Sequence, residues 1–320
     1  MKELHLACLV WGEPYTSWFL ERHPPSLLLP NNLPAWNVTK RAYVYVAAEE
    51  GREIASHPSF QALAEHCASI EVLDVGSLAE LSKLNIHGLM AACQRLTVKR
   101  AWESDAGLVW IYPDTVFSNG SFATVARHAA LGKRAVVAFG ICVEARSREA
   151  LSPPPEARAM VRASLDCLHP MMHHITWGSP SFTTYPSSIF WNGAGLVLRC
   201  WHLQPIFVHA RRCHPEFQWT LDGDFLEQAV DFDDCGFVDD SDEFLLIELA
   251  GHNKKPPRQV MPPTVDNVAR WAQRWTTPVH PRFVCHPFVF HSGDAGVLAP
   301  LVEESRAIID EILSRLHAPA

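Results

Sequence analysis

The chain has 320 residues, of which 48% are hydrophobic and 19% are charged, so it holds enough apolar side chains to bury a sizeable core. Its net charge of −8 argues against a general nucleic-acid-binding protein, because such proteins carry a basic surface. No apolar run approaches the roughly 20 residues of a membrane span, and the apolar start LHLACLVW is typical of a strand rather than a secretion signal. Nine cysteines without a CxxC spacing favour free thiols in a reducing compartment. We therefore expect a cytoplasmic protein, and peripheral membrane association stays open.

Short apolar segments alternate with helix-compatible segments over the first 140 residues. The segments expected to form strands are 4–11, 42–47, 69–75, 107–112 and 134–143. The helix-compatible segments between them are 15–29, 51–67, 79–103 and 121–132. Strands that are apolar along their whole length indicate a parallel sheet with helices on both faces. The sequence therefore predicts an α/β fold with a doubly wound, mostly parallel central sheet, whose ligands bind beyond the carboxyl ends of the strands.

The alternation ends near residue 145. The later segments with a recognisable pattern are a helix at about 155–172, strands at 194–201 and 243–250, and an amphipathic closing helix at 304–316. We expect a Rossmann-like half over residues 1–145, and a more irregular half over 146–320 that completes the active site within one compact unit.

A lone aspartate, Asp114, follows the strand expected at 107–112 in the stretch YPDTVFSNGS. It is either a turn or helix-capping residue or a functional carboxylate. Asn119, Gly120 and Ser121 then open a helix, and the backbone N–H groups at a helix start suit an anion such as a diphosphate. On the functional interpretation, Asp114 holds the divalent cation that bridges this anion.

The segment 222–243, DGDFLEQAVDFDDCGFVDDSDE, holds ten acidic residues and no basic one. Either it forms solvated loops, or some of its carboxylates lie at the edge of the core, where mutual repulsion raises their pKa values or recruits a cation. A calcium loop is disfavoured, because Cys235 occupies a ligand position. The candidate active-site carboxylates are Asp222, Asp224, Asp240, Asp242 and Glu243.

Two further stretches end apolar segments with polar residues. In HPFVFHSGD, His291 closes a strand-like run and is either a core histidine or a ligand. In IFWNGAGLVLR, Trp191 and Asn192 precede small residues that permit close approach of a ligand or another backbone. His169 and His173 share a helix spacing, but they lack an obvious third partner for zinc.

Together these motifs resemble nucleotide-sugar-dependent glycosyltransferases of the GT-A fold. More narrowly, the chain is similar to bacterial glycosyltransferase-like proteins that begin W-G-x-x-Y…S-L-L-x-P-x-N-L-P and later carry S-P-D-x-x-x-S-D-G-S. The corresponding stretches here are WGEPYTSWFLERHPPSLLLPNNLP (11–34), YPDTVFSNGS (112–121), TLDGDFL (220–226) and VDDSDEFLLIEL (238–249). The resemblance covers most of residues 4–145 and 185–250.

The resemblance implies a transferase that moves a sugar from a nucleotide-diphosphate donor to a glycan or another hydroxyl acceptor, in bacterial surface polysaccharide or glycoconjugate synthesis. It implies Mn²⁺ or Mg²⁺ held by a strand-end D-x-D motif, where Asp114 stands, and by a late histidine in an H-x-G context, which is His291. Val116 replaces the second aspartate of that motif, so helix-start amides or a cationic side chain are alternative diphosphate ligands. The residues that the resemblance places at the donor are Trp11, Gly12, Tyr15, Asp114, Asn119, Gly120, Ser121, Trp191 and Asn192.

The carboxylates Asp222, Asp224, Asp242 and Glu243 are then the candidates for deprotonating the acceptor or stabilising the sugar cation. Two other classes of function stay open. One is a non-catalytic sugar- or nucleotide-binding protein with the same fold, which the incomplete D-x-D favours. The other is a metal-dependent hydrolase or nucleotidyltransferase that uses the acidic segment and the histidines. The sequence does not indicate an oligomeric state.

Overall fold

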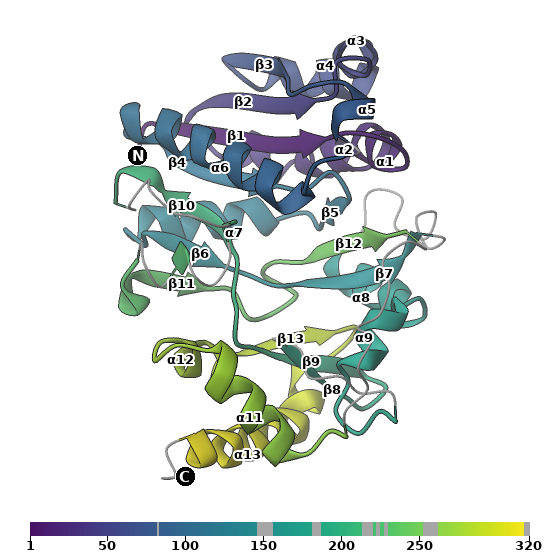
Figure 1. Cartoon of the computed structure of the whole chain (residues 1–320), viewed down its shortest axis with the longest axis vertical. Helices are drawn as coiled ribbons and strands as arrows, with labels where there is room; N and C mark the ends of the chain where they lie inside the picture. Colours follow the sequence, from purple (N-terminus) through teal and green to yellow (C-terminus); the bar gives the residue numbers. More distant parts are fainter. Residues whose placement is uncertain are drawn as a thin grey trace. The chain divides into compact units, whose positions relative to one another are not determined.

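The computed structural model describes residues 1–81, 83–145, 156–180, 187–212, 220–221, 225–226, 230–251 and 262–316 (Figure 1). The chain forms two compact units, and each unit is built from separate stretches of sequence. Unit one consists mainly of residues 1–138 and 204–238, and unit two mainly of residues 139–145, 156–203 and 239–320. The boundary that the sequence suggests, between residues 145 and 146, divides halves of the chain rather than these packing units, and it stays a prediction.

Unit one contains a seven-stranded sheet in the order β11-β6-β10-β4-β1-β2-β3. Its strands are β1 (Glu3–Val10), β2 (Thr39–Val46), β3 (Ser69–Asp74), β4 (Gly107–Ile111), β6 (Ala135–Val137), β10 (Pro205–His209) and β11 (Cys235–Phe237). Strands β3, β2, β1 and β4 are parallel neighbours, as are β6 and β11, and only β10 pairs antiparallel. The mostly parallel central sheet predicted from the apolar runs is confirmed.

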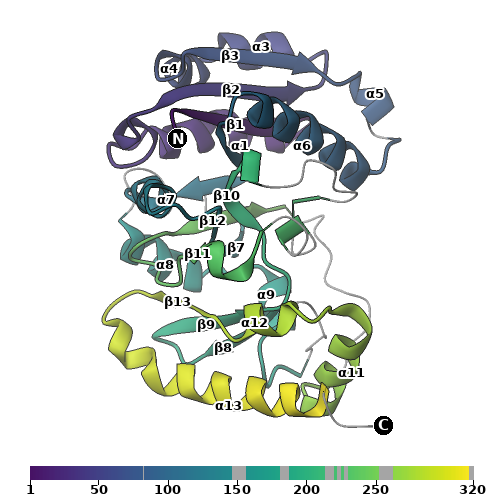
Figure 2. The same ribbon diagram turned by 90° about the vertical axis from the view of Figure 1, so that its left-hand side faces the viewer.

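Helices cover both faces of this sheet. They are α1 (Tyr15–Glu21), α2 (His23–Leu27), α3 (Gly51–Ser56), α4 (Pro58–Glu65), α5 (Leu78–Leu81), α6 (Ile86–Glu103) and α7 (Ser121–Ala130). Figure 2 shows α6 on one side of the sheet and α4 and α7 on the other. Residues Leu4–Val10 are all buried, which explains why β1 is apolar along its length instead of alternating. The predicted doubly wound α/β fold is therefore the fold of this unit.

The strand expected at 134–143 is in fact two strands. Strand β6 ends at Val137 in the sheet of unit one, and β7 (Gly140–Glu144) pairs in parallel with β12 (Leu246–Ala250) in unit two. Gly140 permits this second pairing, because a Cβ atom there would lie 2.9 Å from the carbonyl oxygen of Leu246. The continuous apolar run hid the switch, since strands of both sheets are buried.

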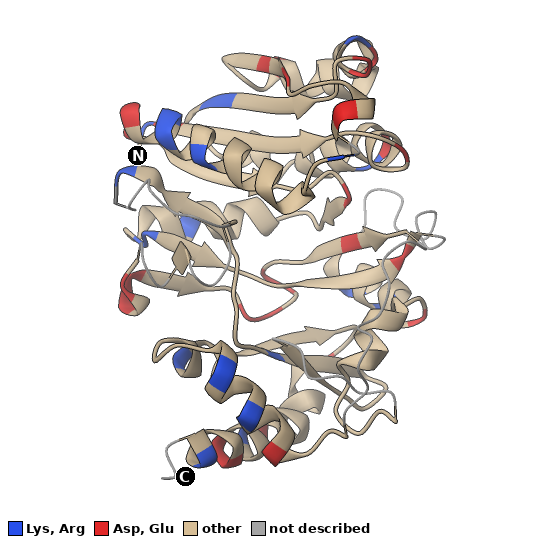
Figure 3. Ribbon diagram, viewed as in Figure 1, with Lys and Arg blue, Asp and Glu red and all other residues tan. Residues whose placement is uncertain are grey.

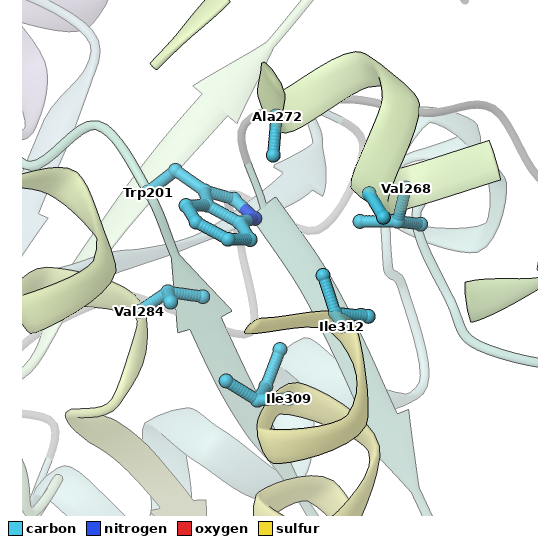
Figure 4. Packing of buried hydrophobic residues seen from close by; sticks show 7 residues of the cluster. Trp201, Val268, Ala272, Val284, Ile309 and Ile312 are labelled. Carbon is cyan, nitrogen blue, oxygen red and sulfur yellow. The ribbon is translucent and has the colours of Figure 1, made fainter. Parts of the chain in front are cut away.

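Unit two also contains an antiparallel sheet of β8 (Ser187–Trp191), β9 (Gly195–Cys200) and β13 (Pro287–His291). Its helices are α8 (Ala157–Leu165), α9 (Pro170–His174), α11 (Val265–Trp275), α12 (His280–Val284) and α13 (Ala299–Leu316). Figure 4 shows Trp201 packed among side chains of α11, α12 and α13. The closing helix predicted at 304–316 is confirmed and begins five residues earlier, and Ile309 and Ile312 on its apolar face are buried.

Arg199 fixes α13 to strand β9. Arg199 is buried, with 1% of its surface exposed. Its guanidinium donates to Ser305 Oγ (2.9 Å), to the carbonyl of Val302 (3.2 Å) and to the carbonyl of Cys285 (2.5 Å). Burial lowers the pKa of Arg199 to about 10. Two of these hydrogen bonds hold α13 to β9, and the third fixes the residue after α12.

A buried histidine joins helix α2 to β5 (Thr115–Phe117) in unit one. His23 Nδ1 lies 2.9 Å from the carbonyl oxygen of Thr115, so Nδ1 carries the proton and donates it. The ring stacks on Phe19 and is fully buried. Nε2 has no hydrogen-bond partner in the described part of the chain, and burial lowers the pKa of His23 to about 4. The folded protein therefore holds His23 neutral.

We expect His23 to make unit one sensitive to acid. Its pKa is about 4 when folded, against about 6.5 when unfolded, so its contribution to stability is complete above pH 6.5 and is lost as the pH falls towards 4. The free energy of unfolding should fall by about 1.4 kcal/mol per pH unit in this window, or about 3 kcal/mol in all. Urea titrations between pH 7 and 4 measure this slope. His23→Asn should flatten it, and His66→Asn, at an exposed position, should not.

Candidate functional site

The clearest cluster of chemical groups lies at the edge of the antiparallel sheet of unit two. Residues 239–241 run parallel to β13, with Val289 N–H donating to the Asp239 carbonyl (2.6 Å) and Ser241 N–H to the Val289 carbonyl (3.0 Å). Asp240 is thus paired with Val289, and Asp242 comes level with His291. After Asp240 the chain turns: the N–H groups of Glu243 (3.0 Å) and Phe244 (3.1 Å) donate to the Asp240 carbonyl, and the Asp242 N–H donates to Asp240 Oδ1 (2.8 Å). This turn brings both carboxylates to one imidazole.

Three side chains meet there. His291 Nε2 lies 2.9 Å from Asp240 Oδ1 and 3.8 Å from Asp242 Oδ2, and one ligand atom from each residue lies within 4.8 Å of the others. The His291 side chain is 2% exposed, whereas those of Asp240 and Asp242 are 39% and 37% exposed. The imidazole is therefore fixed in the protein and the carboxylates face solvent. In Figure 3 the ribbon of the loop between β11 and β12, which contains Asp240 and Asp242, is coloured red at its acidic residues.

The hydrogen bonds of His291 define what this cluster needs. Its Nδ1 lies 2.6 Å from the carbonyl oxygen of Gly293, and a carbonyl only accepts, so Nδ1 is the donor. In a neutral ring Nε2 would then be a bare lone pair facing the Asp240 carboxylate. Nε2 and Asp240 Oδ1 would then be two acceptor atoms 2.9 Å apart, and this distance requires either a second proton on the ring or a cation held between the two atoms. Two carboxylates and an imidazole are a suitable donor set for Mn²⁺ or Mg²⁺, so the residues fit a divalent metal.

Arg158 of helix α8 flanks the cluster. It forms a forked pair with Asp242, with Nη2 2.6 Å from Oδ2 and Nε 3.0 Å from Oδ1. This hydrogen bonding is the main cause that holds the pKa of Asp242 below its usual value, and His291 adds to it. Asp242 is thus a carboxylate at neutral pH. Because the Arg158 side chain is 54% exposed, its guanidinium also remains accessible to an anion.

Gly195 lets β9 approach the strand that carries His291. It is paired with His291, and a Cβ atom at this position would lie 2.2 Å from the Phe290 carbonyl oxygen and 3.2 Å from the His291 Cα. The sequence predicted that the small residues after Trp191 allow close approach of a ligand or a backbone. For Gly195, the neighbour is the backbone of β13.

A second group of predicted residues lies at the carboxyl edge of the sheet in unit one. The Glu50 carboxylate, just after β2, accepts from the Gly12 N–H (2.9 and 3.0 Å) and from Thr16 Oγ1 (2.9 Å). Asp114, which follows β4, is half-buried. Burial raises the pKa of the Cys8 thiol in β1, and the negative charge of Asp114 adds to this rise. Asp114 thus follows a strand at this edge of the sheet. Its contact with a donor diphosphate, which the resemblance implies, stays a prediction.

The start of α7 is already capped from within the chain. Asn32 is fully buried, and its Oδ1 accepts from the N–H groups of Gly120 (3.0 Å) and Phe122 (3.1 Å). Its Nδ2 donates to the carbonyls of Ser26 (2.8 Å) and Ser118 (3.0 Å). The two helix-start amides therefore have an internal acceptor, which weakens their candidacy as diphosphate ligands. Asn119 accepts from the Asn31 N–H through its side chain, and Ser121 is buried.

The other predicted site residues are more scattered. Tyr15 is exposed at the start of α1, and Trp11 is half-buried beside Gly12. Trp191 stacks against His173, and Asn192 is exposed in the turn after β8. Glu243 is exposed directly after Asp242, whereas Asp222 and Asp224 lie outside the described residues. Asp114 belongs to unit one and His291 to unit two, so a shared metal site for these two residues stays a prediction.

Three residues at this site did not receive their role from the sequence, which predicted Asp242 as a catalytic carboxylate and not as a metal ligand. Asp240 was one of several acidic candidates, and the sequence signal that could have singled it out is the D-x-D spacing Asp240-Ser241-Asp242. Arg158 had no sequence signal, because a forked pair between α8 and residue 242 depends only on tertiary structure.

No protein-family model matches the chain, and no curated protein matches its sequence. Three solved structures that share part of its fold are S. aureus TarS (TM-score 0.28, 11% identity), a putative glucose-1-phosphate thymidylyltransferase from Bacillus anthracis (0.27, 16%) and mouse xyloside xylosyltransferase 1 (0.27, 12%). The matched regions span 45%, 44% and 47% of this chain, and 22%, 55% and 56% of the three other chains, in the same order. A likeness this low assigns no family. Within the described part of the chain, none of the helices has the length and apolar character of a membrane span.

Proposed function

We propose that this protein is a metal-dependent glycosyltransferase that moves a sugar from a nucleotide-diphosphate donor to a hydroxyl acceptor. The observation that carries the proposal is the cluster of Asp240, Asp242 and His291, in which the hydrogen bond to Gly293 leaves Nε2 facing a carboxylate. The sequence resemblance supports it, because such enzymes combine a D-x-D motif with a late histidine in an H-x-G context. The resemblance places this motif at Asp114, where it is incomplete, but the same D-x-D spacing occurs at Asp240-Ser241-Asp242, and the histidine context occurs as His291-Ser292-Gly293.

In this proposal Asp240, Asp242 and His291 hold Mn²⁺ or Mg²⁺, which when bound neutralises the negative charge that grows on a departing diphosphate. His291 serves as a neutral ligand, because its other nitrogen is committed to Gly293. Arg158 orients Asp242 and offers N–H donors to a phosphate oxygen. Glu243, together with Asp222 and Asp224, remains a candidate for removing the proton of the acceptor hydroxyl.

The proposal is tested by a thermal-shift screen with UDP-, GDP-, CMP- and dTDP-sugars in the presence of Mn²⁺, followed by product analysis of each hit. Slow release of the free nucleotide that remains after loss of the sugar supports a glycosyltransferase. A thermal shift without turnover indicates a binding protein and contradicts the proposal. Release of a nucleoside monophosphate and a sugar phosphate from a diphosphate donor indicates a hydrolase. Formation of a nucleoside triphosphate and a sugar 1-phosphate when pyrophosphate is added indicates a nucleotidyltransferase, and either result contradicts the proposal.

Asp114 is tested in the same screen. Asp114→Ala should abolish the thermal shift caused by the nucleotide-sugar while leaving the melting temperature of the free protein within a few degrees of the parent, because the residue is only half-buried. Asp74→Ala, at the exposed end of the edge strand β3 of the same sheet, is the control and should keep the shift. An unchanged shift in folded Asp114→Ala would remove this residue from the donor site.

A further inference from the structure

A pocket in unit two adjoins the cluster of Asp240, Asp242 and His291. It has a volume of about 310 Å³ and lies between strand β13 and the first turns of α13. Its apolar lining includes Val289, Ala299 and Val302, and its charged lining consists of Asp239, Asp240 and Glu303. The volume is at the lower end of the roughly 300–1,000 Å³ typical of small-ligand pockets, which suits one sugar ring rather than an oligosaccharide.

The charges of this pocket exclude one class of ligand. All three charged residues of its described lining are acidic. Asp239 has a neighbour in His286 at 3.4 Å, and Glu303 pairs with Arg306 at 3.0 Å, but neither cationic residue lines the pocket. Each carboxylate has lone pairs beyond those used by one such partner, so it can still accept hydrogen bonds. An anionic ligand would face repulsion here, whereas O–H and N–H donors would be bound.

The pocket also shares a residue with the cluster. Asp240 lines the pocket and contacts His291 through the same side chain. Val289 and His291 are two residues apart on β13, so both side chains lie on the same face of the sheet, towards α13. A ligand seated on Val289 therefore lies next to the carboxylates that are proposed to hold the metal.

We propose that this pocket binds the acceptor as a neutral or amino sugar and rejects uronic acids; this assignment rests on the proposed glycosyltransferase function. The hydroxyl or amino groups of the sugar donate to Asp239, Asp240 and Glu303, and the C–H face of its ring packs on Val289, Ala299 and Val302. The same carboxylates disfavour an anionic donor diphosphate in this pocket, so the acceptor and the charged part of the donor are separated by electrostatics.

Three hexoses of similar shape and different charge test the assignment: methyl glucoside, glucosamine and glucuronate, each titrated by ligand-observed NMR in EDTA. The first two should bind, and glucuronate should bind at least about tenfold more weakly, as expected for repulsion between charges a few ångströms apart near a surface. Ala299→Leu should abolish binding by filling the pocket. Ala307→Leu makes the same change at an exposed position of the same helix and should keep binding.

Glu303→Gln should reduce the discrimination against glucuronate, and Glu304→Gln, its exposed neighbour on α13, should leave it unchanged. Equal binding of all three hexoses to the parent, undiminished binding to folded Ala299→Leu, or the absence of hexose binding would overturn the assignment. Binding is measured without a donor, so the two proposals fail separately. If sugars bind in this order but no donor is turned over, the proposed function falls, and the pocket stands as a sugar-binding site that is not an acceptor site.

Discussion

Mn²⁺ is expected to raise the melting temperature of the parent protein, and this rise should vanish in His291→Ala. A metal that binds only the folded state stabilises it by about 2.7 kcal/mol at a concentration 100-fold above its dissociation constant, which is a shift of several degrees. Loss of an outer-shell partner already costs metal sites about 10–100-fold in affinity, so loss of a direct ligand should cost at least about 100-fold. Asp242→Asn should behave in the same way.

The matched control is Asp239→Asn, which neutralises a neighbouring carboxylate that is not part of the cluster. It should retain the shift caused by Mn²⁺. A shift in folded His291→Ala equal to that of the parent would contradict the metal site, and would leave a protonated His291 bridging two carboxylates as the explanation of its geometry.

Asn32→Ala is expected to cause the largest loss of stability. Asn32 is fully buried and uses both donors and both acceptor sites, so its removal strands two N–H groups of α7 and two carbonyls. Each unsatisfied buried group costs about 1–3 kcal/mol, and partial access of water reduces the sum to about 4 kcal/mol for the free energy of unfolding. Urea denaturation measures this value.

Asn31→Ala is the matched control, because Asn31 directly precedes Asn32 but its side chain is exposed. This substitution should change the free energy of unfolding by less than about 0.5 kcal/mol. Asn32→Asp separates the donors from the acceptors: the carboxylate still accepts from Gly120 and Phe122 but repels the carbonyls of Ser26 and Ser118. It should therefore be destabilising at neutral pH and less so in acid, where the carboxyl group is protonated. A loss below about 1 kcal/mol for Asn32→Ala would show that water replaces the cap.

Asn32 also gives a physical reason for two of the sequence motifs. The N-L-P of the first motif supplies this side chain. The S-N-G-S of the second supplies two of the backbone groups that it binds, at Ser118 and Gly120, and Phe122 directly after the motif supplies a third. The two motifs are 86 to 90 residues apart and are joined by a single buried amide. The occurrence of both motifs in one chain therefore has a structural cause, because they pack α7 against the segment before β2, in addition to any contact with a donor.

The sequence by itself determined β1, β2, β3, β4 and β6 of unit one and their mostly parallel arrangement, because a strand buried on both faces must be largely apolar, and that pattern is local; it did not predict β10 or β11. It also determined the apolar face of α13. It did not reveal the break between β6 and β7 or the antiparallel insertion of β10, since a buried strand has the same composition in either sheet and in either direction. The ligand atoms of the candidate metal centre were also beyond it. Asp240 and His291 are 51 residues apart, and only the register between residues 239–241 and β13, together with the Gly293 carbonyl that fixes the tautomer, decides that these two side chains meet.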